Sequence, residues 1–111
     1  DWVKDDGFRY AQAMETLRQI QTLDTPWIVF GDFNDVPESR TMNAFEQVAR
    51  DATKPSDSAA TFPADEPTIE IDYILSGPSS SWSPASATVM EESIASDHRP
   101  VVAELNLNQD R

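Results

Sequence analysis

The chain has 111 residues, with 20 acidic and 8 basic side chains and a formal net charge of −12. This length suits one modest domain and is too short for two. The basic residues are scattered and form no stripe that would follow a nucleic-acid backbone, and the absence of cysteine excludes disulfides and thiolate metal sites.

No apolar run approaches the roughly 18 residues of a membrane helix, and no signal peptide or lipidation motif is evident. We therefore expect a soluble protein whose location the sequence does not assign. Because the chain begins with Asp1 and not with Met, we also expect it to be a processed product or a cut piece, from which a targeting segment could have been lost.

The first predicted element is a helix from Phe8 to about Gln21. Apolar residues recur there at helical spacing, which is typical of an amphipathic helix packed on a sheet. Arg9 lies at the positive end of the helix dipole, where an anion is preferred. We interpret it as a solvated or locally paired surface charge, with a functional role as the alternative.

The central stretch of the sequence runs from Trp27 to Asn34. Four apolar residues after Pro26 predict a buried strand, and the following Gly31 predicts a tight turn. We expect Asp32 and Asn34 to be held together at the carboxyl end of this strand, while Phe33 turns into the core.

The rest of the chain predicts a second helix, a long loop and three further strands. The Thr61-Phe62-Pro63 run within the loop is an apolar anchor, and Asp72 is the unexpected polar residue of the next strand. The only histidine, His98, lies in a polar turn. The expected ranges are a helix over about 39–50, a loop over 51–67, and strands over 69–75, 87–90 and 101–107.

Polar side chains at three strand ends can converge on one patch if those strands are neighbours. A carboxylate beside His98 would fix its tautomer and support its cationic form. Further carboxylates would hold a hard divalent cation, and an amide would orient a substrate oxygen. Together these groups suit the hydrolysis of a phosphate ester. The residues concerned are Asp32, Asn34, Asp72, Asp97 and His98.

Three motifs carry a resemblance to a known family. Gly31-Asp32-Phe33-Asn34, Ile71-Asp72-Tyr73-Ile74 and Ser96-Asp97-His98-Arg99-Pro100-Val101 resemble, in this order, the three C-terminal signatures of the endonuclease/exonuclease/phosphatase superfamily, which includes deoxyribonuclease I. The family's N-terminal signatures, a strand Asn and a Glu that ligates the metal, have no counterpart before Trp27. The chain therefore resembles the C-terminal half of such a domain.

The resemblance implies an α+β fold. Residues 1–111 would form a single partial domain, part of a four-layer αββα sandwich, consisting mainly of one β-sheet with helices packed on its outer face. The other face of the sheet would meet the missing N-terminal half. Left exposed, that face invites self-association.

The resemblance also implies a role for each candidate residue. Asp32 would position or deprotonate the attacking water, and Asn34 would hold that water or a phosphate oxygen. His98 would contact the phosphate and stabilise the developing charge, with Asp72 hydrogen-bonded to its ring. Asp97 and Asp32 would bind the metal, usually Mg²⁺, with Mn²⁺ or Ca²⁺ as alternatives. Water would attack phosphorus in line, without a covalent enzyme intermediate.

The implied function is metal-dependent hydrolysis of a phosphodiester or phosphomonoester, by a fragment that we expect to be inactive alone. The substrate would be a small molecule, a lipid or a nucleic acid, and the acidic charge favours the first two. The alternative is a non-catalytic interaction domain that retains the hydrolase scaffold. A Ser-His-Asp hydrolase is poorly supported, because Ser96, Asp97 and His98 are adjacent and cannot form a triad by themselves.

Overall fold

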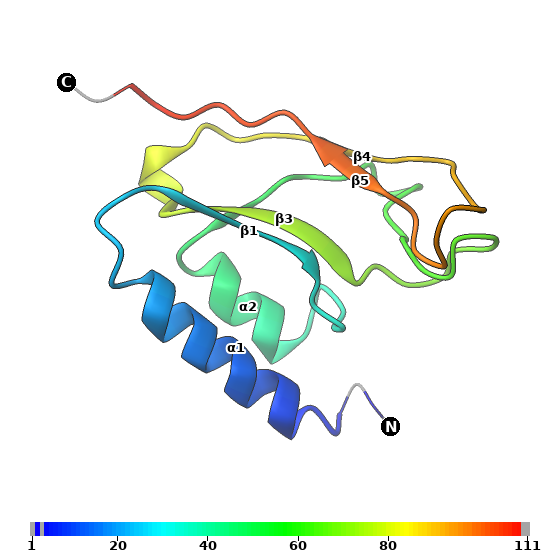
Figure 1. Ribbon diagram of the computed structural model, residues 1–111, viewed down its shortest axis with the longest axis horizontal. Helices are drawn as coiled ribbons and strands as arrows, with labels where there is room; N and C mark the ends of the chain where they lie inside the picture. Colours follow the sequence, from blue (N-terminus) through cyan, green and yellow to red (C-terminus); the bar gives the residue numbers. More distant parts are fainter. Residues whose placement is uncertain (1, 3, 110–111) are drawn as a thin grey trace.

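The computed structural model describes residue 2 and residues 4–109. Within these residues the chain forms helices and short strands in a mixed order (Figure 1). The elements are α1 (Gly7–Ile20), β1 (Trp27–Asp32), α2 (Arg40–Glu46), β2 (Arg50–Asp51), β3 (Asp72–Gly77), the 3₁₀ turn η1 (Ser79–Ser81), β4 (Ala87–Val89) and β5 (Val101–Ala103).

Two antiparallel sheets organise the molecule. The larger has the strand order β1-β3-β2, and its register places Trp27 opposite Gly77 and Asp32 opposite Asp72. The smaller contains β4 and β5, and β5 contacts β3. The mixed α and β character is confirmed. The expectation of mainly one sheet is wrong, because β5 hydrogen-bonds to β4 and not to the larger sheet.

The core lies between the two helices and one face of the larger sheet. In Figure 1 both helices lie on the same side of β1 and β3, and β4 and β5 lie on the other. Leu75 and Phe45 are almost completely shielded from water, which contributes about 1.5–3 kcal/mol each relative to exposure. The core residues are Ala13, Leu17, Trp27, Met42, Phe45, Ala49, Tyr73 and Leu75.

The two helices are tied together at their beginnings. Ser39 caps α2 by accepting the backbone N–H of Met42 at 3.1 Å. Arg40 donates two hydrogen bonds to the carboxylate of Asp6, which precedes α1, at 2.7 and 3.0 Å. These contacts fix the helix starts beside the carboxyl end of β1.

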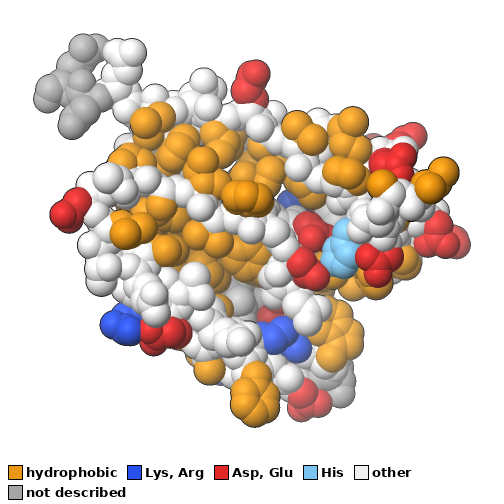
Figure 2. Space-filling view, in the orientation of Figure 1, with side chains coloured by type: hydrophobic (Ala, Val, Ile, Leu, Met, Phe, Trp, Pro, Cys, Tyr) orange, Lys and Arg blue, Asp and Glu red, His pale blue; other side chains and the backbone are white. Residues whose placement is uncertain are grey.

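The opposite face of β1 is open to solvent. Ile28 is 43% exposed and Phe30 is 73% exposed, so β1 is buried on one face only. The prediction of a buried strand is therefore right for Trp27, right in part for the half-buried Val29, and wrong for Ile28 and Phe30. Figure 2 shows an apolar area across this side of the molecule, which reaches toward the histidine and its acidic neighbours.

Several predicted elements differ in their bounds. The first helix is confirmed at Gly7–Ile20. The second ends early because Arg50 joins β2 and its guanidinium donates to the carbonyls of Ser79 and Trp82. The strand predicted over 69–75 begins at Asp72, since Ile69 pairs with Phe62 instead. The last strand is shorter than 101–107.

None of the helices in the described part of the chain is long and apolar enough to cross a membrane.

Asp51 provides a test of the packing at the sheet edge. Burial raises its pKa to about 6, and Glu70 and Glu46 act in the same direction, whereas Lys54 opposes them. The native state therefore favours the protonated carboxyl. This contribution to stability is present below the ordinary pKa of 3.8 and is lost as the pH rises through 6.

We expect Asp51→Asn to raise the free energy of unfolding near neutral pH, and the gain to vanish at about pH 4. Urea denaturation at several pH values measures both effects. Asp65→Asn, at an exposed carboxylate, is the matched control. Equal stability of Asp51→Asn and wild type at neutral pH would contradict the assignment.

Candidate active site

The turn after β1 presents Asp32 to solvent. Gly31 has a φ of 131° and Asn34 a φ of 54°, both in the region that L side chains rarely adopt. The backbone N–H of Asn34 donates to Oδ1 of Asp32 at 2.7 Å, which closes the turn. The ring of Phe33 packs edge-on against Phe45, with centroids 5.2 Å apart. The predicted arrangement of this turn is therefore confirmed.

Asp72 lies directly across the sheet from Asp32. Its Oδ2 accepts hydrogen bonds from the hydroxyl of Thr61 at 2.7 Å and, when Nδ1 is protonated, from His98 at 2.8 Å. The hydroxyl oxygen of Thr61 also accepts the backbone N–H of Ile71 at 3.2 Å, so the hydroxyl proton is left for Asp72. These contacts fix the carboxylate in one position.

Thr61 is a site residue that the sequence reasoning treated only as an apolar anchor. Its side chain is completely buried, and its backbone carbonyl accepts the N–H of Arg99 at 2.8 Å. Thr61 thus supports Asp72 through its side chain and the turn containing His98 through its backbone. A Thr in a long polar loop gives no periodic signal that would have revealed this role.

His98 comes to Asp32 and Asp72 from the turn before β5. Its Nε2 lies 3.6 Å from Oδ2 of Asp32, on the opposite side of the ring from Asp72. The ring rests on Phe62, with centroids 4.8 Å apart. The predicted convergence of three chain segments on one patch is present in the structure.

The acidic surroundings of His98 raise its pKa above the ordinary 6.5. The hydrogen bond to Asp72 is the largest cause, and the charges of Asp72, Asp32 and Asp97 add to it. A protonated ring donates Nδ1–H to Asp72 and keeps Nε2–H as a donor at the exposed side of the cluster. An imidazolium in this position can stabilise negative charge on a neighbouring oxygen.

Asp32, Asp72 and His98 have a donor set that fits a divalent cation in part. One ligand atom from each lies within 4.8 Å of the others, and carboxylate oxygens are the ligands that hard cations prefer. Three residues do not complete the six or more ligands of such an ion, so other groups would have to contribute. Asp97 is exposed and lies outside this group.

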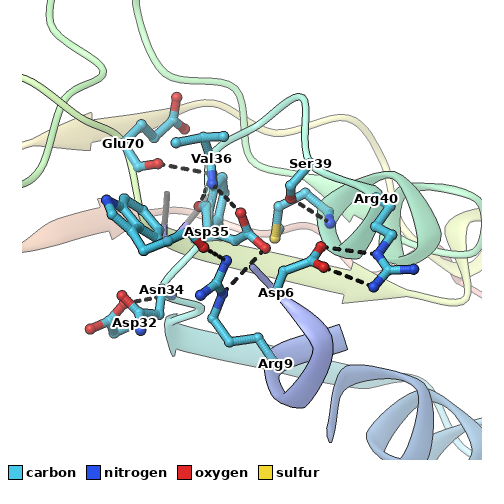
Figure 3. Close-up of polar contacts among 12 residues, drawn as sticks. Asp6, Arg9, Asp32, Asn34, Asp35, Val36, Ser39, Arg40 and Glu70 are labelled. Atoms are coloured by element: carbon cyan, nitrogen blue, oxygen red, sulfur yellow. Dashed lines mark hydrogen bonds and ion pairs between the residues drawn. The ribbon is translucent and has the colours of Figure 1, made fainter. Parts of the chain in front are cut away.

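Asn34 is also exposed, and it contacts Asp32 through its backbone N–H and not through its side-chain amide. Figure 3 shows the Asp32 and Asn34 side chains on the same side of the turn. An open groove of about 330 Å³ lies between this turn and α1, and a second of about 310 Å³ lies beside Asp72 and His98. The cluster is thus open on two sides.

A sequence model described as the Endonuclease/Exonuclease/phosphatase family matches residues 2–98. The chain belongs to this family. The match ends at His98 and so contains all five of the candidate residues. Membership indicates a phosphoesterase scaffold, and the family is generally metal-dependent, in agreement with the acidic and histidine cluster.

Two solved structures share the fold. One is a functionally unknown conserved protein from Enterococcus faecalis V583, with 23% identity and a TM-score of 0.71 over 90% of this chain and 44% of that one. The other is an endonuclease/exonuclease/phosphatase family protein from Bacteroides thetaiotaomicron, with 23% identity and a TM-score of 0.64 over 87% and 43%. The chain thus spans less than half the length of either structure. No curated protein matches it.

We expect Asp72→Asn to lower the pKa of His98, because the variant removes the hydrogen-bonded charge that raises this pKa most. Titration of the ring by NMR measures the change. Asp24→Asn, which removes one charge before the other end of β1, should leave the pKa of His98 nearly unchanged. Equal effects of the two variants would show that only net charge matters.

Proposed function

We propose that this chain is the C-terminal half of a metal-dependent phosphoesterase domain and that Asp32, Asp72 and His98 form the centre of its active site. The observation that carries the proposal is the convergence of two carboxylates and an imidazole from three separate segments. In a chain of this family, such a cluster suits attack of water on a phosphate ester.

Asp32 is the proposed group that orients or deprotonates the attacking water. Its Oδ1 accepts the N–H of Asn34, and its side chain is 44% exposed. Its Oδ2, which lies 3.6 Å from Nε2 of His98, is the oxygen that would accept the proton from water. The amide of Asn34, on the same turn, would hold this water or a phosphate oxygen. Water attacks phosphorus in line, and the ester oxygen leaves without a covalent enzyme intermediate.

His98 is the proposed donor to the phosphate. The raised pKa of His98 favours the protonated ring, whose Nε2–H faces the same space as Oδ2 of Asp32. Asp72 and Thr61 hold the ring in the orientation that this donation requires. The imidazolium then stabilises charge as it develops on the phosphate oxygens.

Mg²⁺ is the proposed metal, with Mn²⁺ or Ca²⁺ as alternatives, and Asp32 and Asp97 are its proposed ligands. A bound cation would supply positive charge at the phosphate oxygens. Asp97 lies outside the tight cluster but close enough to His98 to influence its pKa, and it faces solvent. The remaining ligands would come from outside this chain.

The exposed face of β1 supports the assignment to half of a domain. Ile28 and Phe30 form an apolar surface of the kind that a second sheet covers in a four-layer sandwich. We propose that the N-terminal half of the domain packs there and that the isolated chain is inactive.

For the substrate, the net charge of −12 favours a small or lipid phosphodiester over long nucleic acid.

The apolar face predicts self-association of the isolated chain. We expect Phe30→Lys to reduce the mass measured by sedimentation at high protein concentration, because it places a charge on the exposed apolar surface. Phe8→Lys, at a 91% exposed residue of α1, is the matched control. A monomeric wild-type chain at every concentration would contradict self-association.

The hydrolase assignment is tested in a chain extended by the rest of the domain. We expect hydrolysis of bis(4-nitrophenyl) phosphate with Mg²⁺, its loss on chelation, and a decrease of about a hundredfold or more in both Asp32→Ala and His98→Ala. Asp24→Ala is the control. A folded extended chain that hydrolyses no phosphate ester would favour a non-catalytic interaction domain. Full activity of either active-site variant would refute the mechanism.

A further inference from the structure

Arg9 and Asp35 form a buried ion pair beside the candidate active site. The side chain of Asp35 is fully shielded from solvent, and its Oδ1 accepts the N–H of Val36 at 3.0 Å. Its Oδ2 has no hydrogen bond to the described residues, and Nε of Arg9 lies 3.6 Å away, likewise buried and without one. Because an isolated buried charge is costly, each of these two groups depends on the other.

This finding corrects the interpretation of Arg9 as a surface charge. Its side chain is only 18% exposed. The guanidinium also donates from Nη2 to the carbonyl of Trp2 and lies 5.1 Å from the centre of the Trp2 ring. Arg9 is thus held on several sides and directed toward Asp35, as Figure 3 shows.

Asp35 is the residue directly after the turn that carries Asp32 and Asn34. Its backbone carbonyl accepts a hydrogen bond from the hydroxyl of Tyr73 at 2.8 Å. Residue 35 is therefore held through its backbone by β3 and through its side chain by Arg9 of α1. Asn34, whose backbone is in the left-handed region, lies between β1 and the held residue Asp35. Such a conformation persists only when the surrounding structure imposes it.

Arg9 also lines the groove of about 330 Å³ that Asp32 and Asn34 border. The pair thus connects the wall of this groove to the proposed catalytic turn. We propose that Arg9 is a positioning residue for the reaction: by holding Asp35, it keeps the N–H of Asn34 on Oδ1 of Asp32 and leaves Oδ2 aimed at the water. The inference rests on the proposed function.

Hydrogen exchange of the Asn34 amide tests the positioning in this chain without any activity. Arg9→Met alone leaves a buried carboxylate and risks unfolding. The decisive variant is therefore the double variant with Arg9→Met and Asp35→Asn, which removes both charges. We expect a folded chain in which the Asn34 amide exchanges about tenfold faster or more, since one hydrogen bond to a charged acceptor is weakened.

Arg18→Met is the matched control, because Arg18 pairs with Glu15 on the exposed face of the same helix. It should leave the Asn34 amide unchanged. Unaltered exchange of Asn34 in the folded double variant would overturn the proposal and leave the pair with a purely structural role.

The second readout is kinetic and uses the extended chain. We expect the double variant with Arg9→Met and Asp35→Asn to lower kcat by about ten- to a hundredfold with KM nearly unchanged, because small displacements of a catalytic group cost this much. Arg9→Lys should recover part of the loss. Unchanged kcat would overturn the positioning role. A wild-type extended chain that hydrolyses nothing would instead refute the proposed function, and the amide exchange of Asn34 would then decide the role of Arg9.

Discussion

The antiparallel pairing of β1 with β3 is the constraint on which the site depends. Its register places Asp32 opposite Asp72, so the two carboxylates lie on the same face at the same end of the sheet. A shift of one residue would turn one of them toward the helices. The hydrogen bond from the N–H of Phe33 to the carbonyl of Ile71, at 2.9 Å, extends the pairing into the turn. The position of His98 then follows from its hydrogen bond to Asp72 and from the hydrogen bond of the next residue, Arg99, to the carbonyl of Thr61.

The two faces of this strand pair have different roles. One face packs on α1 and α2 through a continuous core. This packing holds in place the two strands that carry the polar groups. The other combines exposed Ile28 and Phe30 with the charged cluster at its end. The electrostatic interactions of charged groups beside an apolar surface become stronger when that surface is covered, because excluding water lowers the local dielectric constant. Covering the face would therefore both stabilise the fold and strengthen the site.

The sequence predicted those site residues that interrupt a local pattern, such as an acidic residue in or beside an apolar strand. Asp32 and Asp72 stood out because they lie beside or within apolar strands, and His98 because it is the only histidine. The structure brings all three together. The contributions of Thr61 and Arg9 were not predictable, since both depend on contacts between segments far apart in the chain. The apolar run of β1 by itself predicted burial, because an unbroken apolar run is expected of a strand covered on both faces. Only the resemblance implied that one face of the sheet would be open.

Paramagnetic line broadening by Mn²⁺ tests most directly whether this cluster is a cation site. The amide signals of a labelled sample of this chain would be followed as Mn²⁺ is added at substoichiometric amounts, with Mg²⁺ as the competitor. We predict that the signals of residues near Asp32, Asp72 and His98 broaden first and that Mg²⁺ restores them. Broadening centred on other acidic residues, such as Glu46 and Glu70, with these signals unaffected, would contradict it.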